Sequence, residues 1–440
     1  MSFDSFPLHP DLKQGIADLG FTRPTPIQHS AIPPALEGRD LLACAMTGSG
    51  KTAAFLLPIL QRLSGRKRGT TRALIVTPTR ELAAQIVDHV HDLARHTDLR
   101  AAAVYGGVGF GPQERAFRQG VDVIVACPGR LLDHFRQPYA RLAGLEVLVL
   151  DEADRMLDMG FLPDIRRVLK HLPPIDQTLL FSATMPSPIV ALSRQLLRDP
   201  VRLNVERRAA PATGVSQAVY PVRQELKSHL LLALLDGGEI DNVLVFTRTK
   251  HRANRLAQFL SRRGVACDRI HGNRSQAQRT RALADFKHGR IRALVATDIA
   301  ARGIDVEALS HVVNFDVPNL PQDYIHRVGR TARAEATGEA FTFVAPQEGA
   351  DLRDIERAVG KSLPRRTLDG FDLDARPAEA LEIPLAQRLA AMRSKRAADR
   401  NRARQKADRQ PQRPAARRPA RGDDQRREGH QPRPPAAGPK

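Results

Sequence analysis

The sequence contains no tryptophan and few aromatic residues of any kind. Aromatic side chains make up 5% of the chain and hydrophobic residues 42%, so its cores must consist mostly of Leu, Val, Ile and Ala. Its three cysteines, Cys44, Cys127 and Cys267, are widely spaced and odd in number. A disulfide framework or a zinc site needs several cysteines at regular spacing, and neither is therefore expected.

Long apolar segments are also missing. No run approaches the ~18 continuous apolar residues that a membrane-spanning helix needs. The first residues, MSFDSFPLHPDLKQG, do not place a basic start before an apolar run, so no signal peptide is expected. These absences predict a soluble cytoplasmic protein with no membrane partner.

Charge is abundant and unevenly distributed. The chain carries a net charge of +20, and residues 385–440 alone hold 17 Lys/Arg against 5 Asp/Glu, or +12. This segment has no aromatic residue and is rich in Pro, Gln and Ala, so it cannot bury enough surface to fold. It is either a solubilising disordered tail or a disordered tail that attracts phosphate backbones. Its excess of Arg favours the second interpretation.

Short β-branched runs alternate with amphipathic helices up to about residue 370, which is typical of parallel sheets covered by helices on both faces. The runs are DLLACA, ALIVTP, AAAVYGG, VDVIVAC, VLVLD and QTLLFSAT in the first half, and VLVFTRT, RALVATD, HVVNFDV and EAFTFVA in the second. The stretch ERRAAPATGVS between the halves lacks periodicity and predicts a linker. Two α/β lobes would leave a cleft, with ligands at the carboxyl ends of the strands.

A glycine-rich stretch, LLACAMTGSGKTAAF, joins the first apolar run to a helix. Glycine N–H groups can wrap phosphate oxygens, Lys51 can reach the outer phosphates, and the Thr52 hydroxyl can bind Mg²⁺. The usual GxxxxGK pattern begins with Gly, whereas Ala45 stands at that position here. The rest of the match predicts a nucleotide phosphate site.

Further along, VLVLDEADRMLDMGF ends an apolar run on three acids in four positions. Charge at the end of a buried strand needs a partner. Asp151 can hold Mg²⁺ for the phosphates, and Glu152 can orient or deprotonate an attacking water. A solvated acidic helix start is the alternative for the tetrapeptide alone, and the glycine-rich stretch upstream argues against it.

The stretch GFTRPTPIQ precedes the glycine-rich loop. The carboxamide of Gln28 can both donate to and accept from an adenine edge, the pairing that side chains use to read adenine in DNA. Phe21 offers a stacking face, although a core position is equally compatible with its sequence context.

Taken in order, these stretches resemble the DEAD-box ATP-dependent RNA helicases of superfamily 2, from Phe3 to about Gly360. The matching first-half motifs are PTPIQ, AMTGSGKT, PTRELA (Pro78–Ala83), Gly106-Gly107, CPGR (Cys127–Arg130), Asp151–Asp154 and Ser182-Ala183-Thr184. Those of the second half are VFTRTK, Gln276–Arg279, ATDIAARGID (Ala296–Asp305) and HRVGRTAR (His326–Arg333). The start, the stretch HRVGRTARAEATGEA and the basic tail resemble the bacterial RhlE-like subgroup.

Three positions depart from the family pattern. Cys127, Arg248 and Ala332 take the places of Thr, Asn and Gly, and none of these changes removes a charged catalytic group. The resemblance implies two RecA-like parallel-sheet lobes in tandem with a disordered basic C-terminal tail. The implied boundaries are 1–205 for the first lobe, 206–217 for the linker, 218–370 for the second lobe and 371–440 for the tail.

The resemblance also implies that ATP and Mg²⁺ bind between the lobes. The implied catalytic residues are Lys51, Asp151 and Glu152, with Arg330 and Arg333 as arginine fingers, and Thr52 and Asp151 as the metal-binding residues. The implied nucleotide-binding residues are Phe21, Gln28, Thr47, Gly48, Ser49, Gly50, Lys51, Thr52, Gly303 and Asp305. Ser182, Thr184, Asp154 and His326 would couple the nucleotide site to the RNA site.

RNA would lie across both lobes. The implied contacts are Arg80, Gly107, Gly129 and Arg130 on the first lobe, and Thr249, Gln276, Arg279, Thr297 and Arg302 on the second. Hydroxyl, amide, backbone and Arg groups suit phosphate and sugar, so single-stranded and short duplex RNA would bind independently of sequence. Contacts to 2′-hydroxyl groups would favour RNA over DNA. Ribosomal precursor or mRNA-decay complexes are the expected partners.

The implied activity is ATP-dependent, local and non-processive separation or remodelling of RNA duplexes and RNA–protein complexes. An ATP-gated RNA clamp or annealing factor is the main alternative, because it needs the same cleft and a flexible polycation can screen two strands. A DNA translocase of the same superfamily is a second alternative, against which PTPIQ and the DEAD residues argue. A phosphate-loop enzyme unrelated to nucleic acid would leave the second lobe and the tail unexplained.

Overall fold

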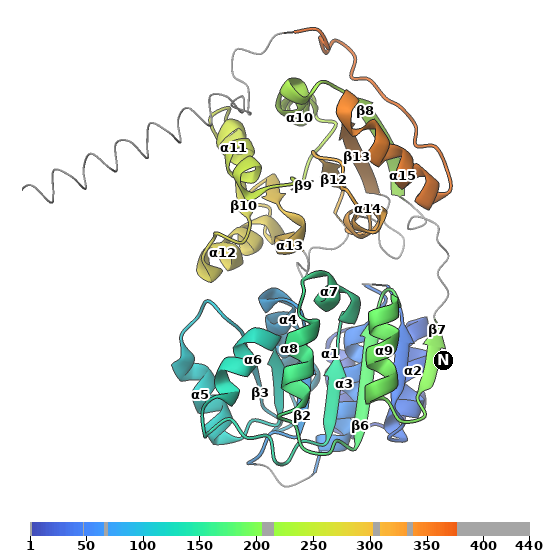
Figure 1. The fold of residues 1–440 in the computed structure, drawn as a ribbon, viewed down its shortest axis with the longest axis vertical. Coiled ribbons are helices and arrows are strands. Elements are labelled where there is room, and N and C mark those ends of the chain that lie inside the picture. The colour runs from blue at the N-terminus through green and yellow to red at the C-terminus, as the bar shows by residue number, and fades with distance from the viewer. Residues whose placement is uncertain are drawn as a thin grey trace, which may run out of the picture. The chain divides into compact units, whose positions relative to one another are not determined.

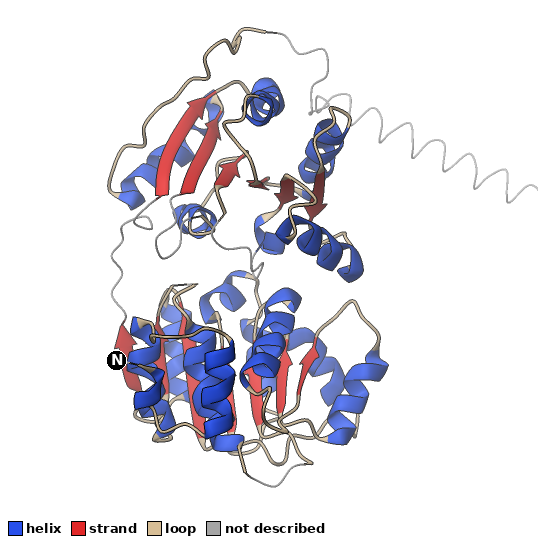
Figure 2. Ribbon diagram, turned by 180° about the vertical axis from the view of Figure 1, so that it is seen from behind, coloured by secondary structure: helices blue, strands red, loops and turns tan. Residues whose placement is uncertain are grey.

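The computed structural model describes residues 2–46, 48–65, 69–204, 215–301, 309–331 and 338–375. Within these ranges the chain forms two sheets whose strands all pair in parallel, and helices cover the sheets (Figures 1 and 2). The predicted α/β architecture of two parallel-sheet lobes is therefore confirmed. In the described part of the chain, the helices are all too short or too polar to cross a membrane.

The first sheet has the strand order β3-β4-β2-β5-β6-β1-β7. Its strands are β1 (Leu41–Cys44), β2 (Ala73–Val76), β3 (Ala101–Val104), β4 (Val123–Ala126), β5 (Val147–Leu150), β6 (Gln177–Ser182) and β7 (Val201–Asn204). The helices of this lobe are α1 (Pro10–Asp18), α2 (Pro26–Leu36), α3 (Lys51–Leu63), α4 (Arg80–Leu93), α5 (Phe110–Gln119), α6 (Pro128–Phe135), α7 (Ala153–Asp158), α8 (Leu162–Leu169) and α9 (Ser187–Leu196), with a short 3₁₀ helix at Phe3–Ser5.

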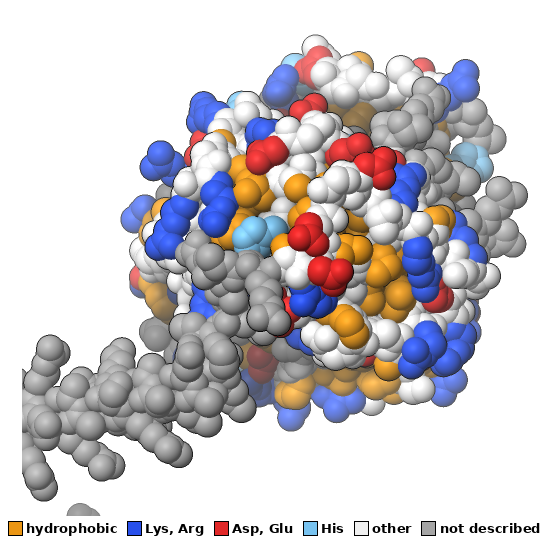
Figure 3. Space-filling view, turned by 90° about the horizontal axis from the view of Figure 1, so that it is seen from above, with side chains coloured by type: hydrophobic (Ala, Val, Ile, Leu, Met, Phe, Trp, Pro, Cys, Tyr) orange, Lys and Arg blue, Asp and Glu red, His pale blue; other side chains and the backbone are white. Residues whose placement is uncertain are grey.

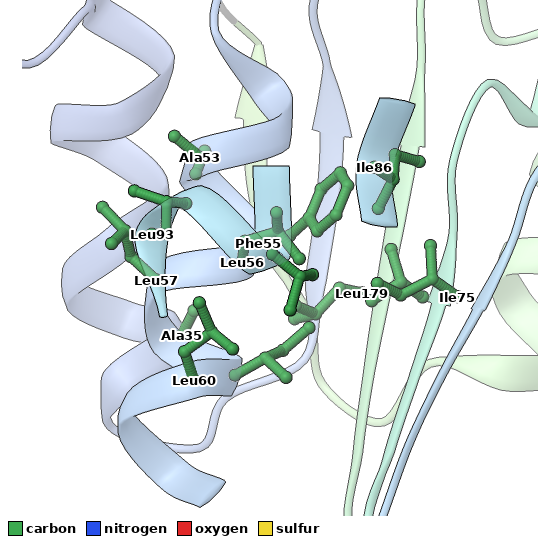
Figure 4. Close-up of a cluster of buried hydrophobic side chains, with 14 of the residues drawn as sticks. Ala35, Ala53, Phe55, Leu56, Leu57, Leu60, Ile75, Ile86, Leu93 and Leu179 are labelled. Atoms are coloured by element: carbon green, nitrogen blue, oxygen red, sulfur yellow. The ribbon is translucent and has the colours of Figure 1, made fainter. Parts of the chain in front are cut away.

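Successive side chains of the central strands point to opposite faces of the first sheet, so a hydrophobic core forms on each face. Ala73 and Ile75 of β2 pack against α1 to α4, whereas Leu74 and Val76 pack against α5 to α9. Figure 4 shows part of the first core, in which Phe55 of α3 lies among side chains of the neighbouring helices and strands. Strands that are buried on both faces have continuous apolar sequences, which is why they could be predicted from the sequence.

The second sheet has the order β10-β11-β9-β12-β13-β8. Its strands are β8 (Val215–Pro221), β9 (Val243–Phe246), β10 (Cys267–Ile270), β11 (Ala293–Ala296), β12 (His311–Asn314) and β13 (Gly338–Val344). The helices are α10 (Lys227–Asp236), α11 (Lys250–Ser261), α12 (Gln276–Lys287), α13 (Asp298–Ala301), α14 (Pro321–Val328) and α15 (Gly349–Val359), with 3₁₀ turns at Gln224–Leu226 and Pro346–Glu348. Val243 and Val245 of β9 face one core, and Leu244 and Phe246 face the other.

The described ends of the second lobe differ slightly from the implied boundaries. Strand β8 begins at Val215, inside the stretch 206–217 that was expected to be a linker, because it pairs with β13 along its whole length. Downstream, Phe371 and Ala375 still pack against the second-lobe core, and Arg223 donates to the Leu373 and Ala375 carbonyls at 3.1 and 2.7 Å. The rest of the expected tail, residues 376–440, lies outside the described residues.

The parallel topology positions the predicted site residues. All strands of one sheet end at the same edge, so the residues that follow β1, β2, β4, β5 and β6 lie along that edge. The glycine-rich loop follows β1, and the DEAD residues follow β5. In the second lobe, Thr249 follows β9 and Thr297 follows β11 in the same way.

Candidate functional site

The predicted phosphate loop connects β1 to α3. Gly50 precedes α3 with φ at +91°, and a Cβ atom there would lie 2.5 Å from Nε2 of Gln28. Glycine alone satisfies both the left-handed backbone and this close approach. Lys51, the first residue of α3, is buried, and its Nζ donates to the Ala45 carbonyl at 3.0 Å. The backbone at the end of the strand therefore fixes the position of the lysine.

The remaining phosphate-loop residues lie on the same turn. Gly48 belongs to the loop, and the Ser49 hydroxyl donates to the Met46 carbonyl at 2.8 Å. Thr52 is half-buried in the first turn of α3. The N–H groups at the start of a helix have no partner within the helix and favour a negatively charged ligand. Thr47 lies outside the described residues.

Gln28 and Thr25 join the PTPIQ stretch to the phosphate loop. Nε2 of Gln28 donates to the Gly50 carbonyl at 3.1 Å, and the Thr25 hydroxyl donates to the Ser49 carbonyl at 2.7 Å. The Gln28 Oε1 atom also accepts from the Thr25 N–H at 2.9 Å. An amide nitrogen has two N–H groups and its oxygen two lone pairs, so each atom retains capacity for a second bond to an adenine edge.

Phe21 lies near this junction and is 40% exposed. Its ring stacks on that of Phe3, with centroids 6.1 Å apart and an interplanar angle of 27°. The sequence left open whether Phe21 is a core residue. Its exposure excludes a fully buried position and leaves part of the ring available to a ligand.

The acidic residues after β5 are buried. Glu152 has φ of 53° and ψ of 50°, a left-handed conformation that is uncommon for a residue with a side chain. Both oxygens of its carboxylate accept from Nη1 of Arg155, at 2.9 and 2.8 Å. The Asp151 Oδ1 atom accepts from the Glu152 N–H at 2.9 Å, which supports this turn. Backbone strain of this kind is typical of functional sites.

Burial and charge move the pKa values of these two carboxyl groups in opposite directions. Desolvation raises the pKa of Asp151 to about 6, although the Lys51 ammonium partly opposes the shift. Burial alone would also raise the pKa of Glu152, but the positive charges of Arg155, Lys51 and Arg330 lower it below its ordinary value. Glu152 is therefore ionised at neutral pH.

Asp154 connects the DEAD residues to the Ser182-Ala183-Thr184 stretch after β6. The N–H and hydroxyl groups of Thr184 both donate to Asp154 Oδ2 at 2.8 Å. The Ser182 hydroxyl accepts from the Asp154 N–H at 3.2 Å and donates to the Thr184 carbonyl at 2.6 Å. Burial would raise the pKa of Asp154, yet these donors and the Lys51 charge lower it.

The second lobe contributes the HRVGRTAR stretch on α14 and its C-terminal end. Arg330 is buried. The burial of His326 itself, together with the nearby Arg155 charge, lowers the pKa of His326 to about 4. Arg327 donates from Nε and Nη2 to the Asp298 carboxylate at 2.6 and 2.8 Å, and from Nη1 to Asn314 at 3.0 Å. Arg327 was not predicted as a site residue, and its bonds hold α14 against the start of α13 after β11.

Five residues of the predicted site cannot be placed. Besides Thr47, these are Arg302, Gly303, Asp305 and Arg333, which lie outside the described residues, as does the family departure at Ala332.

On the first lobe, the predicted RNA contacts follow the adjacent strands β2, β3 and β4. Arg80 begins α4, and a Cβ atom on Gly107, where φ is +83°, would lie 2.1 Å from Nη1 of Arg80. Gly129 is exposed in the first turn of α6. Next to it, Arg130 donates from Nη1 and Nη2 to the Val108 carbonyl at 3.1 and 3.2 Å. The structure thus places these four residues along one edge of the sheet.

On the second lobe, the predicted contacts lie at the starts of α11 and α12 and after β11. Thr249 caps α11, because its Oγ1 accepts from the Arg252 N–H at 3.2 Å, and Thr297 is half-buried after β11. Gln276 donates to Glu81 Oε1 at 2.9 Å, and Arg279 pairs with Glu81 Oε2 at 3.0 Å. Glu81 belongs to PTRELA and is not among the residues predicted from the sequence.

Two family departures have local explanations. The Arg248 guanidinium donates to the Val317 carbonyl at 2.9 Å and lies 3.4 Å from Glu348, so it is bound to its own lobe. Cys127 is buried, and desolvation raises the pKa of its thiol to about 12. The thiol is therefore neutral and unreactive at physiological pH.

Known protein families and proteins resemble this chain over most of its length. The sequence model of the DEAD/DEAH box helicase family matches residues 25–192, and that of the helicase conserved C-terminal domain matches residues 226–335. A DEAD-box ATP-dependent RNA helicase CshA from Bacillus cereus is 41% identical over 381 residues, which cover 87% of this chain and 71% of that protein. Its namesake from Bacillus subtilis is 41% identical over 365 residues, covering 83% of this chain and 74% of that protein.

A solved structure has a similar fold. Saccharomyces cerevisiae Dbp5 bound to RNA and ADP BeF3 superposes with a TM-score of 0.76 at 32% identity, covering 83% of this chain and 95% of that one. The expected RhlE-like subgroup stays a prediction.

Proposed function

Because the chain belongs to the DEAD-box ATP-dependent RNA helicases, we propose that it couples ATP binding and hydrolysis to local, non-processive remodelling of RNA. Membership of this family makes it an RNA-stimulated ATPase. The observation that best supports the proposal is the setting of Glu152, which is buried, ionised and held in a left-handed turn beside Arg155.

ATP would bind at the phosphate loop. Lys51 and the N-terminal turn of α3 would hold the phosphates, while Phe21 would stack on adenine and Gln28 would pair with its edge. Because Gln28 also bonds the Gly50 carbonyl, adenine recognition would be transmitted directly to the phosphate loop.

The donor set fits Mg²⁺. Asp151 and Thr52 offer the oxygen ligands that this cation prefers. Asp151 is also a buried carboxyl with a raised pKa, so a cation would supply the counter-charge that its surroundings only partly provide. When bound, Mg²⁺ would neutralise negative charge on the phosphates.

Glu152 would act as the group that orients and deprotonates the attacking water. A general base must be ionised to accept a proton, and the surrounding positive charges keep it so. Arg330 and Arg333 would stabilise the charge that spreads over the phosphate oxygens in the transition state. An arginine in this role is worth ~10³–10⁵ in rate. Supplying it from the second lobe would make hydrolysis depend on that lobe.

Asp154, Ser182, Thr184 and His326 would carry the coupling between ATP and RNA. Hydrogen bonds among Asp154, Ser182 and Thr184 link the turn after β5 to the neighbouring strand β6. His326 is neutral at physiological pH, because burial lowers its pKa to about 4. It would therefore act through hydrogen bonds rather than through charge.

RNA binding would rely on the phosphate and sugar. The described contacts are guanidinium, amide, hydroxyl and exposed backbone groups, which carry no sequence information by themselves. Local strand separation would follow if the bound strand is bent, since unstacking costs ~1.4 kcal/mol per step by analogy with DNA.

The basic tail would add affinity that is independent of sequence. The face of the molecule in Figure 3 carries Lys and Arg mainly around its margins, with acidic and apolar side chains between them. Residues 385–440, by contrast, concentrate a charge of +12. Deleting them should raise the KM for RNA and flatten its salt dependence. Unchanged affinity and salt slope would make the tail a solubiliser.

The experiment that tests remodelling against the clamp or annealing alternative uses one labelled RNA duplex. Strand displacement and annealing are measured under the same conditions, with ATP and with a non-hydrolysable analogue. Glu152→Gln serves as the matched variant, because it keeps the shape of the side chain and removes its charge.

Remodelling predicts ATP-dependent displacement that the Glu152→Gln variant lacks. A clamp predicts long-lived RNA binding with the analogue and no displacement with ATP. Annealing without displacement would support the alternative of an annealing factor.

A further inference from the structure

Two apolar side chains are exposed beside the predicted RNA contacts of the first lobe. Val108 is 39% exposed and Phe110 is 41% exposed. Val108 directly follows Gly107 in the loop between β3 and α5, and Phe110 is the first residue of α5. Figure 1 shows where α5 lies in the first lobe. Single exposed apolar residues are common on protein surfaces, so exposure by itself indicates nothing.

Buried side chains of α5 and α6 hold this loop and the Phe110 ring in place, which distinguishes Phe110 from an incidental surface residue. The Gln113 amide donates to the Tyr105 and Gly109 carbonyls at 3.1 and 3.3 Å, so α5 fixes both ends of the loop. His134 of α6 is fully buried. Its Nε2 atom lies 3.2 Å from Gln113 Oε1, and its Nδ1 atom lies 2.9 Å from the Tyr139 hydroxyl oxygen. The Phe110 ring rests on His134, with centroids 4.6 Å apart.

Arg130 connects this ring to the predicted RNA site. Its guanidinium lies over the Phe110 ring, 4.3 Å from the centroid, while two of its five N–H donors bond the Val108 carbonyl. A cation over an aromatic face is attracted to it, so the two side chains orient each other. A rigid aromatic ring and a positive charge therefore stand together next to Gly107 and Gly129.

We propose that Phe110 is an RNA contact that packs against an unstacked base or its ribose while Arg130 holds the adjoining phosphate. The proposal rests on the proposed function, because it requires RNA to pass over Gly107, Gly129 and Arg130. Proteins that bind single strands without sequence preference combine a basic surface with aromatic side chains on which bases stack. Every base has a flat apolar face, so such a contact adds affinity without adding specificity.

Single-stranded RNA suits this site better than a protein partner. The exposed apolar surface consists of two side chains, which is far less than a stable protein interface buries. The flanking charge is positive and already oriented by Phe110, as a phosphate ligand requires.

The absence of tryptophan allows a direct test in the full-length protein. A Phe110→Trp variant carries the only indole in the chain, and a base that packs against it should quench its fluorescence. The variant Leu373→Trp is the matched control, since Leu373 is 40% exposed and its carbonyl accepts from Arg223, which is not one of the predicted RNA contacts. Both are titrated with single-stranded RNA in the presence of a non-hydrolysable ATP analogue.

Affinity is measured in parallel on wild type, Phe110→Ala and Leu373→Ala, by the anisotropy of labelled RNA. Loss of a stacked base predicts about 5-fold or greater weakening for Phe110→Ala, since such a contact is worth ~1–3 kcal/mol. Leu373→Ala should match wild type. A series of RNAs is then used in which a single abasic nucleotide occupies successive positions. One of these positions should weaken RNA binding by wild type, and the same RNA should bind Phe110→Ala about as tightly as intact RNA does.

The outcomes separate this proposal from the proposed function. If wild type binds RNA but Phe110→Ala binds within 2-fold of it and the Phe110→Trp indole is not quenched, the proposed contact is wrong and RNA binding stands. If abasic and intact RNA quench equally, the stacking contact is likewise wrong. If wild type itself fails to bind RNA, the proposed function fails first.

Discussion

The Asp154 carboxylate accepts two hydrogen bonds from Thr184, one from the backbone N–H and one from the hydroxyl, each 2.8 Å long. This pair joins the turn after β5 to the turn after β6, and Ser182 closes the same network. We propose that a change at the nucleotide would reach β6 through this short series of hydrogen bonds.

Replacing Thr184 with Val should weaken this link, because Val has nearly the same shape as Thr but lacks the hydroxyl group. The hydroxyl bond to an ionised carboxylate is worth about 1.5–3 kcal/mol, and the backbone bond remains. We expect the number of RNA strands separated per ATP hydrolysed to fall. Parallel assays of ATP hydrolysis and strand displacement measure this ratio. Thr97→Val, which loses a hydroxyl bond to the Ala94 carbonyl, is the control, and an equal fall there would argue against coupling through Thr184.

Gly107→Ala should disturb RNA binding through Arg80. A Cβ atom at Gly107 would lie 2.1 Å from Nη1 of Arg80, and the left-handed backbone adds strain of about 1–2 kcal/mol. The flexible guanidinium would move aside, so we expect weaker RNA binding and a salt slope smaller by about one. Gly106→Ala is the matched control, since its Cβ atom would lie 3.4 Å from Arg80. Salt titrations of RNA affinity that do not distinguish the two variants would contradict the role given to Arg80.

His134 should make the first lobe sensitive to mild acid. Burial, together with the Arg130 charge, lowers the pKa of His134 to about 4, against the opposing effect of Asp133 and Glu114. The pKa of His134 in the folded state lies below its value in the unfolded chain. The contribution of the neutral ring to the free energy of unfolding is therefore fully present above about pH 6.5 and is lost as the pH falls toward 4. Between pH 7.5 and 5.0 the free energy of unfolding should fall by about 2 kcal/mol.

Urea unfolding at the two pH values measures this loss. The His134→Gln variant cannot be protonated at this position, so its stability should fall by less over the same interval. Equal losses in the two proteins would show that His134 does not have a lowered pKa.

The sequence predicted the central strands of both sheets and missed three of the outer ones. The strands β7, β8 and β10 lie at sheet edges, and none corresponds to an apolar run picked out in the sequence. Edge strands are partly exposed, as the alternating burial of Val201–Asn204 illustrates, so polar residues interrupt their pattern. Central strands are covered on both faces and show the continuous runs that identified them.

The candidate site divides in a similar way. Residues within one motif, such as Lys51 and Glu152, could be predicted because each motif positions its own side chains by local backbone geometry. The bond between Gln28 and Gly50 and the pairing of Glu81 with Gln276 join distant parts of the chain, so a single sequence does not reveal them. Arg155 could have been predicted as a partner, because a basic residue three residues after Glu152 at the start of a helix is close enough in sequence to pair with its carboxylate.

An RNA-gated ATPase is tested most directly by steady-state ATP hydrolysis without nucleic acid, with single-stranded RNA and with DNA of the same sequence. Glu152→Gln is the control, and loss of a positioned general base should lower the rate by ~10²–10⁴. We predict strong stimulation by RNA, little by DNA, and none in the variant. Equal stimulation by RNA and DNA, or a rate indifferent to both, would contradict an RNA-gated ATPase.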